Sequence, residues 1–283
     1  MRDLSFLEKI ARAINEEDEE RNKAYEGRPS KPIRLPLVHR TADRNILKSI
    51  FSDGYLHPPE NASEWETEFN PEPAVFLSWG AAAYPNGDAA LIFYPETLAE
   101  KNSSFTPFDS GGVQEPHLEP TVPDPDPDRP WSDRKVRKEF LDDHTGDCAE
   151  FDEFALHYLH AHFRDIKDYV TLPQNSDPDW PPYHGLRCPE GPDRRAWTIE
   201  IQIPAQVPLR KAQTIVLDGE DLAFGEEFGE QLFVDDGLRV IFLKDGNRRG
   251  EDSRDPNEGY MNRPDPLQRE VSDFIIREYL KTY

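Results

Sequence analysis

Three short apolar runs, far apart in the chain, each end on polar residues, and their spacing constrains the fold more than any other feature. The runs are Leu35–Thr41, Ala74–Ser78 and Trp197–Pro204. Each has the length of a β-strand and carries polar side chains where the backbone should emerge from a core. Residues that share a site without being neighbours in sequence are typical of a cleft built on a sheet. The pattern therefore predicts strands that bring a His, a Ser and a Glu together.

The length and composition of the chain bound the class of protein. Its 283 residues allow one large domain or two small ones, and 36% hydrophobic with 11% aromatic residues is enough to fold. The net charge of -23 argues against duplex DNA and acidic membranes as partners, because phosphate contacts need clustered Lys and Arg. A nucleotide bound as a small ligand in a locally basic cleft is still compatible with this charge.

The cysteine content and the N-terminal stretch indicate the cellular compartment of the protein. Cys148 and Cys188 are too few for a disulfide framework, which favours a reducing compartment. Charges interrupt the apolar residues of the N-terminal stretch, unlike in a signal peptide, and the sequence has no run of about twenty apolar residues. We therefore predict a soluble, cytoplasmic protein that has no membrane partner.

Apolar periodicity and turn residues predict the order of the elements. Helices are expected over 3–27, between Asp43 and Gly54, within 132–170, and from Pro266 onward with Asp265 as cap. Strands are expected near 36–41, 74–78, 89–94, 195–204, 213–218 and 238–243, with a turn at 85–88. The proline-rich segments 103–131 and about 173–193 are predicted as loops, the first on the surface. Strands early and late with helices between them predict a single α+β domain over 1–283, with a helical and proline-rich insertion at about 105–194.

The polar ends of the three runs follow a recognisable order. The first run gives His39-Arg40-Thr41, followed by a capped helix and by Gly54-Tyr55-Leu56; the second gives Phe76 and Ser78; the third gives Glu200-Ile201-Gln202-Ile203-Pro204. This order resembles the ADP-ribosyltransferase superfamily, in particular the His-Tyr-Glu branch that includes the poly-ADP-ribose polymerases. The last run, with Val207-Pro208, is similar to the catalytic strand of DNA-modifying members. The resemblance covers the three runs and leaves about 105–194 unmatched. It implies a split β-sheet core with flanking helices and long proline-rich loops.

The resemblance also implies roles for the residues of the first and third runs. Glu200 would act on the nicotinamide ribose, where a carboxylate can stabilise an oxocarbenium-like transition state. His39 would hydrogen-bond the adenosine ribose. Backbone groups around Arg40 would hold the nicotinamide amide, and Thr41 would add a hydroxyl. The guanidinium of Arg40 also has the geometry to pair with a pyrophosphate oxygen.

The chain departs from the family pattern at two positions. Arg40 stands where the polymerase branch usually has Gly, and Phe76 stands where Tyr is expected. Phe76 can stack on the nicotinamide but has no hydroxyl, so Ser78 would supply the polar contact, as in the Arg-Ser-Glu branch. Gln202 lies two residues after Glu200 and therefore on the same face of the strand. We expect all four to contact the dinucleotide.

A further segment, Thr106–Gly112, combines a rigid Pro with flexible Gly residues and two polar side chains. Such a loop can close over a ligand, with Asp109 or Ser110 reaching into the site. It also fits a tight turn in which Asp109 bonds its own backbone. Both interpretations stay open, and Asp109 is included among the candidates for NAD binding.

The resemblance predicts an NAD-dependent mono-ADP-ribosyltransferase-like enzyme that breaks the nicotinamide–ribose bond of its substrate NAD. The acceptor of ADP-ribose would be a protein side chain, a nucleic-acid base or water. Similar bacterial proteins imply a toxin or an anti-phage effector, with an inhibitor or antitoxin protein as a partner.

Two other classes of function are compatible with the sequence. Glu153, His157 and His160 are spaced so that they share one helical face, as a metal-dependent hydrolase would need, although a solvated helix face accounts for the same residues. A chain this acidic also fits a non-enzymatic role, binding a basic partner or mimicking DNA. Likewise, a His at the end of a strand and a Glu between apolar residues also occur in ordinary half-exposed strands that have no functional site.

Overall fold

The computed structural model describes residues 32–41, 44–59, 69, 73–81, 89–99, 102–121, 128–163, 165–171, 185–189, 194–217, 238–243 and 266–281. The helix predicted over 3–27 and the turn predicted at 85–88 lie outside these residues, as do the predicted caps Asp43 and Asp265.

An eight-stranded sheet forms the centre of the structure, in the order β12-β11-β4-β1-β3-β9-β5-β7. Its strands are β1 (Leu37–Thr41), β3 (Val75–Trp79), β4 (Ala89–Phe93), β5 (Ser104–Thr106), β7 (Gly146–Asp147), β9 (Glu200–Ile203), β11 (Ala212–Leu217) and β12 (Arg239–Phe242). All neighbours are antiparallel except β11 and β12. Two short ladders stand apart: β2 (Tyr55–Leu56) with β10 (Val207–Pro208), and β6 (Glu119–Pro120) with β8 (Leu186–Arg187). The fold is therefore α+β, as predicted.

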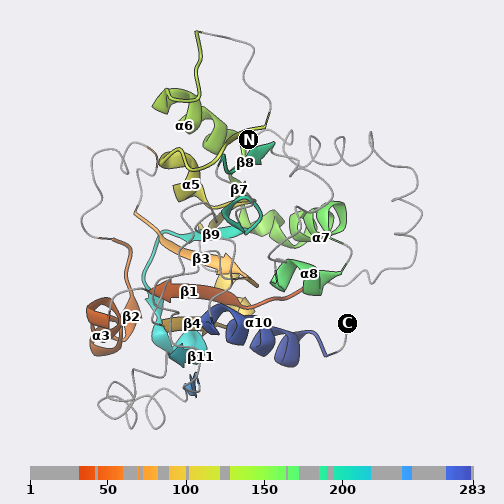
Figure 1. Cartoon of the computed structure of the whole chain (residues 1–283). Helices are drawn as coiled ribbons and strands as arrows, with labels where there is room; N and C mark the ends of the chain where they lie inside the picture. The colour runs from red at the N-terminus through yellow and green to blue at the C-terminus, as the bar shows by residue number, and fades with distance from the viewer. Residues whose placement is uncertain are drawn as a thin grey trace, which may run out of the picture.

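Helices surround this sheet (Figure 1). They are α3 (Arg44–Asp53), α5 (Ser110–Gln114), α6 (Arg134–Asp143), α7 (Phe151–His162), α8 (Ile166–Thr171) and α10 (Pro266–Tyr279). Short 3-10 turns occupy Pro95–Ala99, Cys148–Glu150, Arg194–Ala196 and Leu209–Lys211. None of the helices in the described part of the chain combines the length and the hydrophobicity needed to cross a membrane.

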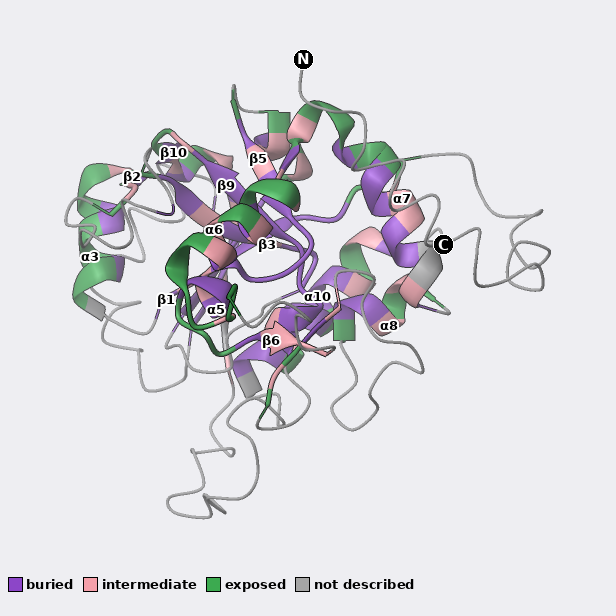
Figure 2. Ribbon diagram, turned by 90° about the horizontal axis from the view of Figure 1, so that it is seen from above, coloured by how far each residue is buried: buried purple, intermediate pink, exposed green. Residues whose placement is uncertain are grey.

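Aromatic packing joins α7 and α8 to the sheet. The ring of Trp79 in β3 lies 5.2 Å from that of Phe151 and 5.4 Å from that of Tyr169, measured between centroids. Phe105 in β5 packs on Phe154 with centroids 4.4 Å apart. These contacts bury large apolar areas, and Figure 2 shows the buried residues gathered on the inner side of α7. Because the rings come from strands β3 and β5, they hold together the part of the sheet that flanks β9.

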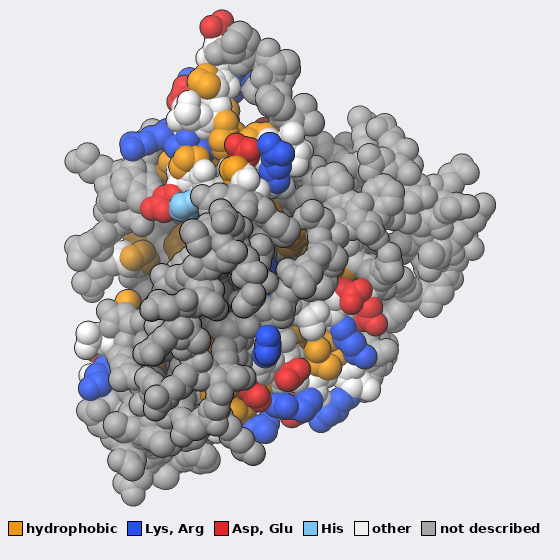
Figure 3. Space-filling model, viewed as in Figure 1, with side chains coloured by type: hydrophobic (Ala, Val, Ile, Leu, Met, Phe, Trp, Pro, Cys, Tyr) orange, Lys and Arg blue, Asp and Glu red, His pale blue; other side chains and the backbone are white. Residues whose placement is uncertain are grey.

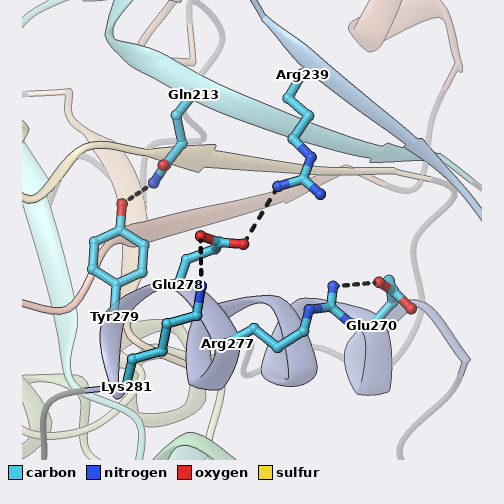
Figure 4. Close-up of polar contacts among 7 residues, drawn as sticks. All are labelled: Gln213, Arg239, Glu270, Arg277, Glu278, Tyr279 and Lys281. Carbon is cyan, nitrogen blue, oxygen red and sulfur yellow. Dashed lines mark hydrogen bonds and ion pairs between the residues drawn. The ribbon is translucent and has the colours of Figure 1, made fainter.

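The C-terminal helix α10 packs on β4, β11 and α8. Gln213 in β11 donates a hydrogen bond to the hydroxyl of Tyr279, and Arg239 in β12 pairs with Glu278 at 3.5 Å (Figure 4). On the face drawn in Figure 3, basic side chains lie among acidic ones over this helix. Such exposed pairs contribute little stability, so the buried apolar side of α10 supplies most of its attachment.

Long elements follow their predictions closely. The strands predicted at 74–78, 89–94, 213–218 and 238–243 are β3, β4, β11 and β12, and the helix predicted from Pro266 is α10. The helix predicted to end at Gly54 is α3, and Gly54 takes a φ of 72° that favours glycine. These predictions are confirmed.

The prediction that 103–131 forms a surface loop is wrong. This segment contributes β5, α5 and β6, and Phe105, Phe108 and Val113 are buried. Its elements are too short for periodicity to reveal, and β5 exists because β9 and β7 pair with it on both sides. The predicted helical stretch 132–170 is divided into α6, α7 and α8, with β7 between the first two. The strand predicted to begin at 195 begins at Glu200 instead. The segment predicted as a loop at about 173–193 contains the short strand β8.

Candidate functional site

Glu200 lies on an inner strand of the sheet, at the first position of β9. Its Cα is paired with Ser78 in β3 on one side and with Thr106 in β5 on the other. Residues directly opposite each other in a sheet point to the same face. The structure therefore places the side chains of Ser78, Glu200 and Thr106 in one row across three strands.

A second row lies two residues further along the same face. Gln202 is paired with Phe76 in β3 and with Ser104 in β5. Its side-chain nitrogen donates a hydrogen bond of 3.0 Å to Oε1 of Glu200. Phe76, Ser78, Glu200 and Gln202, all predicted as site residues, are thus neighbours on one face of the sheet.

β1, which belongs to the first predicted run, lies next to this site at the point where its pairing with β3 ends. β1 pairs with β4 along its whole length, but with β3 only at Leu37 and Val38. Val38 is opposite Ser78, so its Cα lies two strands, or about 10 Å, from that of Glu200. His39 follows directly, and its Cα is therefore within about 14 Å of that of Glu200.

The side chains beyond Val38 leave β1 in alternating directions. The side chain of Arg40 points to the same face of the sheet as that of Val38, whereas His39 and Thr41 point to the opposite face. Thr41 is buried, and Nδ1 of His39 lies 3.3 Å from the carbonyl oxygen of Phe76. Burial lowers the pKa of His39, partly opposed by this backbone contact, which favours a neutral imidazole. The structure thus brings His39 to the backbone of β3, while Arg40 extends beyond the row of Ser78 and Glu200.

The Thr106–Gly112 segment is anchored beside Glu200. Thr106 donates a 2.7 Å hydrogen bond to the carbonyl of Phe108, and the backbone N–H of Asp109 donates to the carbonyl of Arg195 at 2.8 Å. The hydroxyl of Tyr158 in α7 reaches the carbonyls of Pro107 and Trp197. A segment held at so many points is a fixed wall of the site.

The structure shows the tight turn at Asp109 and brings Ser110 to Glu200. Asp109 caps α5 by accepting a 3.1 Å hydrogen bond from the N–H of Gly111, which is the local turn. Ser110 points to the site, and its hydroxyl donates a 2.6 Å hydrogen bond to Oε1 of Glu200. The sequence indicates Asp109 or Ser110 as the residue that reaches into the site, and only Asp109 is among the candidates for NAD binding.

The electrostatic state of Glu200 is unusual. Its side chain is 7% exposed, and burial is the main cause that raises its pKa well above the ordinary value. The negative charge of Asp109 raises this pKa further, while the hydrogen bonds from Ser110 and Gln202 lower it. Perturbed carboxyls of this kind are concentrated at functional sites.

Tyr169 braces the strands that carry this site. It is fully buried, and its hydroxyl donates to the carbonyl of Trp79 at 2.6 Å and accepts from the N–H of Ile199 at 3.2 Å. Trp79 directly follows Ser78, and Ile199 directly precedes Glu200. The phenol therefore ties β3 to β9 at the residues next to the candidate site, which the sequence did not indicate.

The described residues do not gather a metal centre. Among them, no group of three or more His, Cys, Asp or Glu side chains lies close enough to hold an ion. Glu153 and His157 form a surface pair at 4.0 Å, and the side chain of His160 is outside the described residues. Burial and the charge of Asp147 raise the pKa of Cys148 to about 12, which disfavours the thiolate that metals bind.

Comparisons with known proteins give remote structural likenesses only. No protein-family model matches the chain, and no curated protein matches it. Similar solved structures include Thermus sp. 2.9 DarT in complex with NAD+, at 14% identity and a TM-score of 0.39, covering 76% of this chain and 98% of that one. The complex with carba-NAD+ has 12% identity, a TM-score of 0.38 and coverages of 76% and 97%. The complex with ADP-ribosylated ssDNA has 12% identity, a TM-score of 0.36 and coverages of 77% and 99%. We therefore argue the function of this chain from its own residues.

Proposed function

We propose that the protein is an NAD-dependent mono-ADP-ribosyltransferase-like enzyme with Glu200 as its catalytic carboxyl. The observation that carries the proposal is the placement of Glu200. It is buried on an inner strand of the sheet, in one row with Ser78, and is held by Ser110 and Gln202 close to where β1 separates from β3. The sequence resemblance adds the substrate, because it matches His39, Phe76 and Glu200 to the positions that contact NAD in the His-Tyr-Glu family.

The proposed reaction breaks one bond and forms another. The C1′–N bond of the nicotinamide riboside breaks, and its electron pair goes to the nicotinamide nitrogen, which loses its positive charge. An acceptor atom then forms a bond to C1′ and releases its proton. Ionised Glu200 stabilises the positive charge that develops on the ribose and orients the 2′-hydroxyl. This work requires a carboxyl held in one orientation, as the bonds from Ser110 and Gln202 provide.

Other residues are proposed to bind the dinucleotide. Phe76 would stack on the nicotinamide, and Ser78 and Gln202 would contact its ribose or amide. Asp109 would line the same side of the site. On β1, His39 would hydrogen-bond the adenosine ribose, Arg40 the pyrophosphate, and Thr41 the nicotinamide side through its hydroxyl. A ligand lying across the separation of β1 and β3 can reach residues on both sides of β1.

Nicotinamide release tests the proposal directly. The full chain is incubated with NAD, alone for hydrolysis and with labelled NAD plus cell lysate for transfer. We expect Glu200→Gln to lower release on the order of 100-fold or more, because the substitution removes the charge but keeps the size. Glu153→Gln, at a carboxyl 68% exposed on α7, is the matched control and should retain full activity. If the wild type releases no nicotinamide under any of these conditions, the proposed function is wrong.

The acceptor and the biological role are further parts of the proposal. The net charge of -23 favours a protein or a small-molecule acceptor, or water, over duplex DNA. A toxin or an anti-phage effector in the cytoplasm, restrained by an inhibitor protein, follows from the resemblance. Expression in bacteria tests this role: the wild type should arrest growth, and Glu200→Gln should not.

A further inference from the structure

Two hydrogen bonds that hold Glu200 come from different parts of the fold. Gln202 lies on the same strand as Glu200, so its 3.0 Å bond to Oε1 follows from the alternation of side chains along β9. Ser110 belongs to α5 and is 90 residues away in sequence, yet its hydroxyl donates to the same oxygen at 2.6 Å. The bond from Ser110 therefore requires that the segment before α5 is held against the segment before β9.

The hydroxyl of Tyr158, on α7, joins these two segments. Tyr158 is fully buried, and its single hydroxyl proton is shared between the carbonyl of Trp197 at 3.0 Å and the carbonyl of Pro107 at 3.3 Å. Pro107 precedes Ser110 by three residues, and Trp197 precedes Glu200 by three. One phenol thus holds the backbone on both sides of the bond between Ser110 and Glu200.

The ring of Tyr158 is fixed by its packing. It stacks on Phe154 with centroids 5.5 Å apart, and the rings of His162 and Phe163 lie at 5.0 and 6.1 Å. Phe154 in turn packs on Phe105 of β5. A side chain whose rotamer is locked by packing in this way can hold a hydroxyl in place before any ligand binds.

The short helix α5 depends on such support. It has only five residues, and its anchors beside Glu200 are the bond from Tyr158 to Pro107 and the bond from the N–H of Asp109 to the carbonyl of Arg195. A carboxyl that acts on a developing charge must keep its orientation, and a misplacement of about 1 Å can cost about 100-fold in rate. Without the hydroxyl of Ser110, the bond from Gln202 would be left to hold Oε1.

We propose that Tyr158 is a positioning residue for Glu200 and that it acts through Ser110. The segment 105–194, which the family resemblance leaves unmatched, thereby supplies both the donor to Glu200 and the support of that donor. The effect of Tyr158 on a reaction rests on the proposed function of Glu200, whereas the hydrogen bonds belong to the folded chain without a ligand.

Steady-state nicotinamide release by the full chain tests this role. Tyr158→Phe keeps the ring and removes only the hydroxyl. We expect its kcat to fall about 10-fold with KM within about 2-fold of the wild type, because the chemical step depends on the orientation of Glu200. Tyr279→Phe is the matched control, because its hydroxyl binds Gln213 on β11, away from the site, and its kcat should not change. An unchanged kcat in Tyr158→Phe, or a change in KM alone, would overturn the positioning role.

A double variant tests whether Tyr158 acts through Ser110. Ser110→Ala should lower kcat at least as much as Tyr158→Phe. Adding Tyr158→Phe to Ser110→Ala should cause no further loss, since the donor that Tyr158 positions is already gone. Losses that multiply in the double variant would show that Tyr158 acts by another route and would overturn the proposal.

Urea unfolding of the same four chains tests the coupling without a ligand. The fall in midpoint caused by Ser110→Ala should be smaller in the Tyr158→Phe background than in the wild type, at an unchanged slope. Equal falls in both backgrounds would overturn the link from Tyr158 to Ser110, whatever the enzyme does. Coupled midpoints together with a wild type that releases no nicotinamide would overturn the proposed function and would support Tyr158 as the residue that positions Ser110 on Glu200.

Discussion

Replacing Tyr169 by Phe should loosen the two strands that carry the candidate site. The substitution keeps the ring, which packs on Trp79, and removes only the hydroxyl. That hydroxyl donates to the carbonyl of Trp79 and accepts from the N–H of Ile199, both in the buried interior. The variant therefore isolates one bridge between β3 and β9.

The expected cost follows from the groups left without this partner. A buried donor or acceptor that loses its hydrogen bond costs about 1–3 kcal/mol, and Tyr169→Phe affects one of each. We expect a loss of about 2–6 kcal/mol in the free energy of unfolding, the sum for the two groups, with no cavity contribution because the ring still fills its space. Nicotinamide release should fall as well, since Ile199 directly precedes Glu200.

Urea unfolding of the full chain at 25 °C measures this loss as a lower midpoint with an unchanged slope. Tyr55→Phe is the matched control, because Tyr55 is 36% exposed and should change the stability by less than about 0.5 kcal/mol. A Tyr169→Phe variant as stable as the wild type, within about 0.5 kcal/mol, would show that the hydroxyl does not hold the strands together.

Three further predictions concern single side chains near the core. Because the pKa of Glu200 is raised in the folded state, the folded chain keeps a proton on Glu200 that the unfolded chain loses above about pH 4.3. The stability that this bound proton contributes is lost as pH rises through the raised pKa. Asp109→Asn should therefore gain melting temperature relative to the wild type between pH 4 and pH 8, and a constant difference would contradict this. Gly146→Ala should cost about 1–3 kcal/mol in urea unfolding, because the new methyl would lie 2.3 Å from Cζ of Phe105; unchanged stability would mean that the ring moves away freely. Cys148, with its pKa raised to about 12, should react with iodoacetamide at pH 8 far more slowly than in urea, and equal rates in a mass-spectrometric time course would refute a protected thiol.

Local pattern predicted the long elements and part of the site. The apolar stripes of α3, α7 and α10 and the apolar runs of β3, β4 and β11 are formed by residues close together in sequence, so periodicity detects them. Gln202 could be placed beside Glu200 for the same reason, because alternation along one strand is a local property. The two residues do lie on one face, with a 3.0 Å hydrogen bond between them.

The short pieces of the sheet could not be predicted in this way. β5 has three residues and β7 two, and each exists because a distant strand supplies its hydrogen bonds. The sequence therefore predicts a surface loop over 103–131, although Phe105 and Phe108 are buried. Composition indicated Pro and Gly, which favour loops, but composition does not reveal which backbone groups find a partner across the fold.

The sequence by itself determined the α+β class, the long strands and helices, and the polar residues at which three of those strands begin or end. Only the tertiary structure decided that Ser110 donates to Glu200, that Asp109 shares its buried surroundings, and that His39 lies against the backbone of Phe76. The reason is that strand register and burial depend on pairings between segments far apart in the chain. The charge state of a carboxyl depends on those neighbours, and the order of residues alone does not identify them.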